Sequence, residues 1–211
     1  MNIGTTLMDK CIINVSTKKY WKGQERLLRT LENNTDADVL MFKRESDVGA
    51  LPHKDSMYGF KPMAFKKAYE MGYKTVLWLD ASMCVIKDLK PIFDAIEKDG
   101  YYFQDSGWMN ERFTTHEQKE HFGTNEGRMI SSGVLGLELS NFYGHSFYRQ
   151  WITSMQAGMF NGSHDVTRHD QSAASLIIEK MKLKISENNT LWNYGKEPFH
   201  ENIVILADGI C

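Results

Sequence analysis

The strongest constraint on the fold is a short apolar segment that ends at a carboxylate. Residues 75–79 read Thr-Val-Leu-Trp-Leu, and Asp80 follows them directly. A five-residue run rich in β-branched and large apolar side chains is typical of a strand that is buried on both faces. Strands of this kind belong to sheets covered by helices, and ligands bind at their carboxyl ends. The segment therefore predicts an α/β fold with a functional site near Asp80.

Segments with strand-like and helix-like periodicity alternate along the chain, which indicates an α/β sandwich with a mostly parallel, mixed central sheet flanked by helices. Five further strands are predicted, at 11–15, 39–42, 101–103, 133–139 and 203–206. Helices are predicted at 20–31, 62–71, 91–98, 170–181, and from a cap at Asn141 to about Met155. An apolar run also resumes at 84–86, and the polar stretch 105–128 is predicted to be a long loop or insertion.

Length and composition favour a single globular domain over residues 1–211. The hydrophobic content is 42% and the aromatic content is 12%. The net charge of −2 gives no basic excess of the kind that nucleic-acid-binding proteins use to hold phosphates. The chain ends just after an apolar run, so we interpret it as the N-terminal part of a longer protein.

Cysteine usage and hydropathy indicate a cytoplasmic protein. Cys11, Cys84 and Cys211 are odd in number and lack metal-ligand spacing, and the first two lie in apolar runs. We interpret these two as buried, reduced thiols, which favours a reducing compartment. No window approaches the roughly 20 apolar residues of a membrane span, and no signal peptide is evident.

A divalent-cation site is predicted at Asp80-Ala81-Ser82. On an extended segment, residues two apart point the same way, so the Asp80 carboxylate and the Ser82 hydroxyl can meet one ion. Mg²⁺ and Mn²⁺ prefer oxygen ligands and commonly use one or two carboxylates together with substrate phosphates. The alternative interpretation is that Asp80 only caps a turn after its strand.

Two segments are candidates for holding a nucleotide. Asn14-Val15-Ser16-Thr17 follows the first strand and offers polar groups to a nucleobase or ribose; the alternative is an ordinary turn. Lys61 begins a predicted helix, where it can meet a phosphate beside free backbone N–H groups; the alternative is a solvated lysine. Neither GxGxxG nor GxxxxGK[ST] occurs, which excludes the usual dinucleotide and P-loop fingerprints.

Candidates for a sugar-binding site lie later in the chain. Asp170 and Gln171 suit sugar hydroxyls, which both donate and accept hydrogen bonds; the alternative is that Asp170 caps the following helix. Ser132-Gly133 enters a strand with small residues that let a ligand approach the backbone. Among seven histidines, none forms a tight metal pair, and His200 is a candidate further ligand. Asp80 and Asp170 could also form a glycosidase pair.

Taken in order, these motifs resemble the GT-A class of glycosyltransferases over nearly the whole chain. The segment 77–82 is similar to the strand ending in that class's DxD motif, and Ser132-Gly133 to the strand beside the donor sugar. His169-Asp170-Gln171 is similar to its DQ motif, and 14–17 to its nucleotide-contacting turn. Ser82 replaces the second Asp of DxD, so one charged metal ligand is missing.

The resemblance implies a nucleotide-sugar donor, a divalent Mn²⁺ or Mg²⁺ cofactor and a glycan acceptor. The chain is also similar to N-terminal domains of multi-domain chlorella virus proteins that glycosylate the capsid. That resemblance implies UDP-rhamnose or UDP-glucose as donor, an acceptor on a capsid glycoprotein and a location in the host cytoplasm. It also favours a mechanism that retains the anomeric configuration of the donor sugar. For an inverting enzyme, Asp170 and then Asp105 are the candidate catalytic acids.

Two other classes remain open. A binding module would hold a nucleotide-sugar or glycan without catalysis, and the loss of an acidic ligand at Ser82 fits it. A nucleotidyltransferase would share the sheet, but it usually has an early Gly- and Arg-rich loop, which the segment 14–22 lacks.

Overall fold

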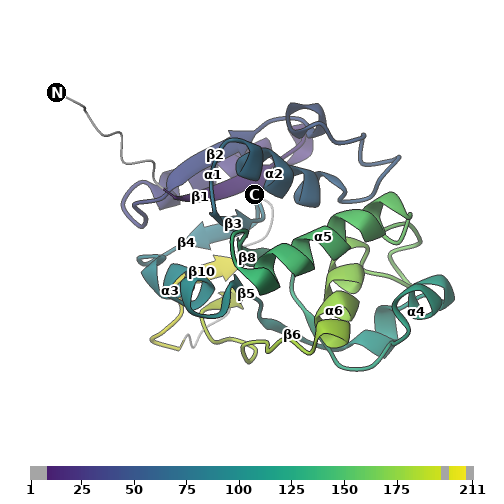
Figure 1. The fold of residues 1–211 in the computed structure, drawn as a ribbon. Helices are drawn as coiled ribbons and strands as arrows, with labels where there is room; N and C mark the ends of the chain where they lie inside the picture. Colours follow the sequence, from purple (N-terminus) through teal and green to yellow (C-terminus); the bar gives the residue numbers. More distant parts are fainter. Residues whose placement is uncertain (1–8, 196–199, 208–211) are drawn as a thin grey trace.

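A five-stranded mixed sheet lies at the centre of the computed structural model, which describes residues 9–195 and 200–207. The strand order is β2-β1-β3-β8-β5 (Figure 1). These strands are β1 (Lys10–Val15), β2 (Asp38–Phe42), β3 (Thr75–Leu79), β5 (Tyr101–Tyr102) and β8 (Val134–Glu138). β1 pairs in parallel with β2 and β3, whereas β8 pairs antiparallel with β3 and β5. The predicted α/β class is thus confirmed, and β8 runs against its neighbours.

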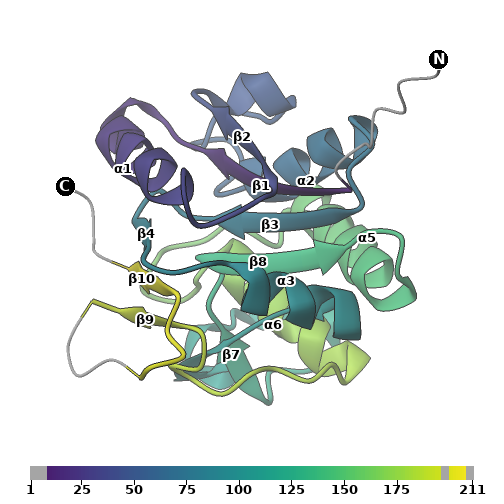
Figure 2. The same ribbon diagram turned by 90° about the vertical axis from the view of Figure 1, so that its left-hand side faces the viewer.

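Helices cover both faces of this sheet because its middle strands are apolar on both sides. Leu77 and Leu79 pack in one core with α1 (Trp21–Leu31) and α3 (Lys90–Asp99). Alternate residues of β3 pack in a second core with α2 (Phe60–Glu70), α5 (Phe142–Gln156) and α6 (Asp170–Met181). Figure 2 shows α3 on the near side of the sheet and α6 on the far side.

The expected boundaries hold closely in most elements. The Asn141 side chain caps α5 by accepting a hydrogen bond from the Tyr143 N–H at 2.8 Å, as predicted. α6 has the predicted bounds, but its N-cap is His169, so the capping role considered for Asp170 is wrong. Asp170 is instead the first residue of the helix.

The polar stretch 105–128 is not a plain loop, which corrects the prediction. It contains β6 (Asp105–Met109), the 3₁₀ helix η3 (Asn110–Phe113) and α4 (His116–Phe122). A capping box between Thr115 and Gln118 starts α4, and Gly123 ends it in the left-handed region at φ 76°. The capping box and the glycine stop define the ends of α4 even though the segment has few apolar residues.

The remaining strands form two smaller sheets. A second sheet has the order β4-β10-β9, and β6 pairs with β7. The bounds are β4 (Met83–Val85), β7 (Arg128–Ile130), β9 (Trp192–Tyr194) and β10 (Ile205–Ala207). Two further 3₁₀ helices are η1 (Lys18–Tyr20) and η2 (Glu45–Val48). Across residues 9–195 and 200–207, every helix is too short or too polar to cross a membrane.

The cysteines follow the expectation in part. Cys11 is a free, buried thiol, and burial raises its pKa. Cys84 is also free but only half-buried, because it lies on the short strand β4 rather than in the central sheet. Cys211 lies outside the described residues.

Candidate functional site

The site lies where the sheet reverses its order. From β1 the chain continues to β2 on one side, and then returns to β3 on the other side of β1. The connections that follow β1 and β3 therefore leave in opposite directions, and a crevice forms between the carboxyl ends of these two strands. Ligands bind at such a switch point in open α/β sheets. The Asp80 N–H donates to the carbonyl of Gly133 at 2.9 Å. This bond brings the start of β8 to the same edge.

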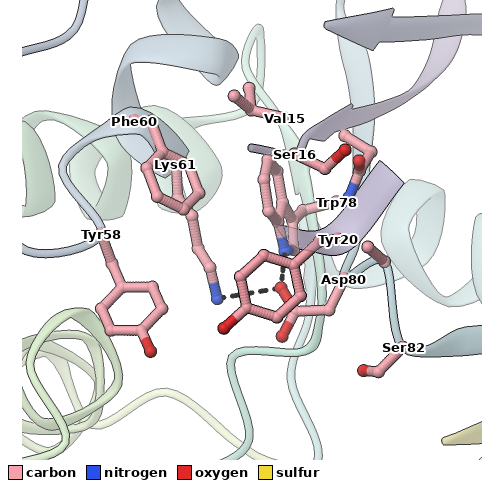
Figure 3. Close-up of a pocket in the computed structure, with 11 residues that line it drawn as sticks. Val15, Ser16, Tyr20, Tyr58, Phe60, Lys61, Trp78, Asp80 and Ser82 are labelled. Carbon is pink, nitrogen blue, oxygen red and sulfur yellow. Dashed lines mark hydrogen bonds and ion pairs between the residues drawn. The ribbon is translucent and has the colours of Figure 1, made fainter. Parts of the chain in front are cut away.

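A pocket of about 230 Å³ opens at this switch point. Its lining comes from the ends of β1 and β3, from η1 and from the start of α2 (Figure 3). The lining residues are Asn14, Val15, Ser16, Tyr20, Tyr58, Phe60, Lys61, Trp78, Asp80, Ala81 and Ser82. Of the predicted site residues, Asn14, Val15, Ser16, Lys61, Asp80, Ala81 and Ser82 are thus brought together.

Lys61 is the centre of a buried ionic cluster below the pocket. Its side chain is 2% exposed, and its Nζ lies 3.2 Å from Asp80 Oδ1 and 3.2 Å from Asp170 Oδ2. The ammonium also donates to the Ser132 carbonyl at 3.0 Å and to the Ser132 hydroxyl at 3.2 Å. The alternative that Lys61 is a solvated lysine is therefore wrong. It is positioned because α2 begins at Phe60, so Lys61 points inward from the first turn.

The cluster brings two carboxyl groups to one ammonium. Burial alone would lower the pKa of Lys61, but Asp170 and Asp80 together raise it above its ordinary value. Burial raises the pKa of Asp170, and the attraction of Lys61 offsets only part of that effect. With all three groups ionised, one positive and two negative charges leave a net charge of −1. A diphosphate would meet repulsion here unless a cation came with it.

Asp80 keeps one carboxylate oxygen available to the pocket. Oδ1 accepts a hydrogen bond from Trp78 Nε1 at 2.7 Å and also pairs with Lys61. The other oxygen, Oδ2, takes part in neither of these contacts, and a Cβ added to Gly133 would lie 3.4 Å from it. The Asp80 side chain is 36% exposed, so water and ligands can reach it.

These atoms fit a hard cation that is held mainly by its substrate. One carboxylate oxygen and one hydroxyl are oxygen ligands of the kind that Mg²⁺ and Mn²⁺ accept. In the described part of the chain, no three His, Cys, Asp or Glu side chains gather in a way that could hold a metal ion. Phosphate oxygens and water would have to supply the other ligands. His200 is exposed and belongs to no such group.

The turn after β1 combines a structural amide with an unused hydroxyl. The Asn14 side chain is fully buried, donates to the Leu79 carbonyl at 2.7 Å and accepts from Gln24 Nε2 at 2.7 Å. Its amide therefore ties β1 to β3 and α1. Ser16 Oγ is buried and has no hydrogen-bond partner among the described residues. Thr17 precedes η1 and lies outside the pocket lining.

The predicted sugar-site residues divide between the cluster and its surroundings. Ser132 accepts hydrogen bonds from Lys61, and a Cβ added to Gly133 would lie 3.4 Å from Asp80 Oδ2. Asp170 is 2% exposed and lies behind Lys61, not in the pocket lining. Gln171 is half-buried in the first turn of α6, where its N–H donates to the Arg168 carbonyl at 3.0 Å.

Asp105 has different partners. Its Oδ2 accepts hydrogen bonds from Arg128 Nε at 2.8 Å and Nη2 at 2.6 Å, and Oδ1 accepts from the Gly107 N–H. These bonds join β6 to β7. Asp105 is not among the pocket residues, so its contacts support a structural role and not the predicted catalytic one.

The sequence interpretation missed the aromatic walls and the support beneath the turn. Tyr20, Tyr58, Phe60 and Trp78 line the pocket. A Cβ on Gly23 would lie 2.4 Å from the Ala81 carbonyl oxygen, so α1 packs directly against the turn that carries Asp80. Trp78 was visible as part of the strand, but nothing in the sequence indicated that the Tyr58 and Trp78 rings would both face the Lys61 ammonium.

The sequence matches no protein-family model, and a search of the curated proteins finds no match.

Proposed function

We propose that this chain is a GT-A-type glycosyltransferase domain that binds a nucleotide-sugar and a divalent cation at the Asp80 pocket. The observation that carries the proposal is the Asp80 carboxylate, which lines the pocket together with Ser82, is 36% exposed and pairs with the buried ammonium of Lys61. A diphosphate that binds beside this carboxylate needs a cation to offset the repulsion between them. The position of the pocket at the switch point of the sheet agrees with nucleotide binding in α/β folds.

The pocket residues supply the other contacts that a nucleotide-sugar needs. Tyr20 and Tyr58 offer aromatic faces, and the Ser16 hydroxyl, which has no hydrogen-bond partner in the described part of the chain, can bond a ribose or base. The cavity of about 230 Å³ lies below the roughly 300–1,000 Å³ usual for whole ligands. It therefore holds one portion of the donor, and the rest extends over the open rim.

Charge stabilisation of the leaving nucleoside diphosphate is the main chemical task. A bound divalent cation supplies Lewis acidity at the diphosphate. Lys61 adds a fixed positive charge next to the same carboxylate, already oriented by Ser132 and Asp170, so no reorganisation is needed as charge develops. Asp170 acts through Lys61, because Lys61 separates it from the pocket.

The described lining residues offer no free carboxylate as the general base that inversion needs. An inverting enzyme needs a general base within hydrogen-bond reach of the acceptor hydroxyl. Among the described lining residues Asp80 is the single carboxylate, and it is paired with Lys61. With retention, an oxygen of the departing phosphate can take the acceptor proton. We propose a UDP-sugar, such as UDP-rhamnose or UDP-glucose, as the donor. The proposed acceptor is a glycan, such as one on a capsid glycoprotein.

Replacing the cation-facing carboxylate tests the proposal. Wild-type protein should melt at a higher temperature with UDP and Mn²⁺ together than with either alone, because ligands of the folded form raise its stability. Asp80→Asn keeps the side-chain volume and should abolish that joint shift. Asp94→Asn is the matched control, since Asp94 is an exposed residue on α3. If Asp80→Asn keeps the wild-type shift, the site is wrongly assigned.

Release of UDP separates the enzyme from the alternative, a non-catalytic binding domain. An enzyme with Mn²⁺ should slowly hydrolyse its UDP-sugar donor and liberate UDP. A binding domain should show the joint thermal shift without any release.

A further inference from the structure

Two strained residues touch each other beside the ionic cluster. The described residues include four non-glycine residues with positive φ, and two of them are Tyr58 and His169, both at φ 55°. Tyr58 lies three residues before Lys61, and His169 directly precedes Asp170. Their rings stack with centroids 5.5 Å apart and planes 29° apart. The two strained positions therefore meet where the two helices that carry the ion pair begin.

The backbone of His169 is strained. Its φ of 55° and ψ of −116° lie outside the small left-handed region that side-chain-bearing residues tolerate. Glycine would adopt this conformation without a Cβ penalty. Strain of this kind persists only when the surroundings impose it, and it gathers at functional sites.

Several contacts hold the His169 ring in place. The ring Nδ1 lies 3.0 Å from the Phe160 carbonyl oxygen, and the backbone N–H of His169 donates to Thr167 Oγ1 at 3.1 Å. Burial lowers the pKa of His169, which favours the neutral ring. On the other side, His53 packs edge-on against Tyr58 with centroids 4.6 Å apart.

The Tyr58 ring connects this stack to the cluster. Lys61 Nζ lies 5.5 Å from the Tyr58 ring centroid and 5.3 Å from that of Trp78. The ammonium is therefore enclosed by two aromatic rings and two carboxylates. Tyr58 also accepts a hydrogen bond through its carbonyl from the Lys61 N–H at 3.0 Å. A shift of Tyr58 would move the start of α2 and the Lys61 side chain with it.

We infer that Tyr58 and His169 are positioning residues, whose stacked rings clamp the start of α2 to the start of α6 and keep Lys61 between Asp80 and Asp170. The role in donor binding rests on the proposed function, whereas the clamp itself does not. A glycine at position 169 would adopt the same backbone conformation without strain. We therefore infer that the strain is tolerated because the imidazole ring is needed at this position. Neither residue needs to transfer a proton.

Chemical protection of Lys61 measures the clamp without any nucleotide. An amine-acylating reagent is applied to the folded protein, and modification of Lys61 is followed by mass spectrometry. The exposed Lys66 of the same helix serves as the internal reference. Wild-type Lys61 should react far more slowly than Lys66, because reaction requires local opening.

His169→Gly removes the ring and relieves the backbone. We expect Lys61 to be modified at least tenfold faster and the joint shift with UDP and Mn²⁺ to shrink, because the ring that holds the start of α2 against α6 is gone. Unchanged Lys61 protection in His169→Gly would overturn the inference.

Tyr58 provides a second pair of variants in case His169→Gly folds poorly. Tyr58→Asn tolerates positive φ but lacks the ring, so it should expose Lys61, whereas Tyr58→Phe keeps the ring and should preserve protection. Equal protection in these two variants would also refute the clamp. A wild-type protein that fails to bind UDP with Mn²⁺ but protects Lys61 would refute the proposed function and leave the clamp standing.

Discussion

Removing the Lys61 charge is the sharpest test of the buried cluster. In Lys61→Met, a chain of similar length remains, but Asp170 loses the ammonium 3.2 Å away and keeps an exposure of only 2%. Leaving one partner of a buried ion pair costs roughly 3–5 kcal/mol. For a chain of this size, 1 kcal/mol corresponds to about 2–4 °C, so the melting temperature should fall by roughly 6–20 °C.

The loss should depend on pH in a defined direction. Burial already raises the pKa of Asp170, and removing Lys61 raises it further. A carboxyl whose pKa is higher in the folded than in the unfolded state stabilises the fold at low pH and loses that contribution as pH rises through the folded pKa. The deficit of Lys61→Met should therefore be largest near neutral pH and shrink as pH falls towards about 4, the ordinary value for Asp.

Two control variants make the measurement specific. Lys66→Met removes an exposed lysine from the same helix, where an i,i+4 pair contributes only about 0.3–0.5 kcal/mol. The double variant Lys61→Met/Asp170→Asn removes both charges and should recover much of the stability, because no buried charge is left unpaired. The assay is thermal denaturation followed by circular dichroism. It runs from about pH 4, near the ordinary pKa of Asp, to about pH 8, above the ordinary pKa of His. If Lys61→Met melts like Lys66→Met at every pH, the electrostatic reasoning is wrong.

Two further substitutions test the pocket and its support. Ser16→Ala removes a buried hydroxyl that has no partner among the described residues, so the melting temperature should be unchanged or slightly higher. The affinity for UDP with Mn²⁺, measured by calorimetry, should fall about threefold to tenfold. An unaltered affinity would remove Ser16 from the ligand site. Gly23→Ala places a Cβ 2.4 Å from the Ala81 carbonyl oxygen, and the overpacking should destabilise the protein by about 1–3 kcal/mol in a denaturant titration; a wild-type midpoint would show that α1 moves freely against the turn.

Local patterns were sufficient for most of the fold. The apolar run of β3, the cap Asn141 and the bounds of α6 all follow from periodicity and capping chemistry. The stretch 105–128 was misjudged because α4 is short and polar, so its capping box was the only clear signal. The direction of each strand was harder to predict than its position. β8 is antiparallel to β3, and an apolar run has the same sequence pattern in either direction.

The sequence by itself determined that this chain forms an α/β fold and presents Asp80, Ser82 and the turn after β1 at one edge of a sheet. Those features depend on neighbours in the chain, so periodicity reveals them. Only the tertiary structure decided that Lys61 is buried between Asp80 and Asp170, that Asp105 pairs with Arg128, and that Tyr58 stacks on His169. These contacts join residues far apart in sequence, and their burial and charge balance exist only once the helices have packed on the sheet.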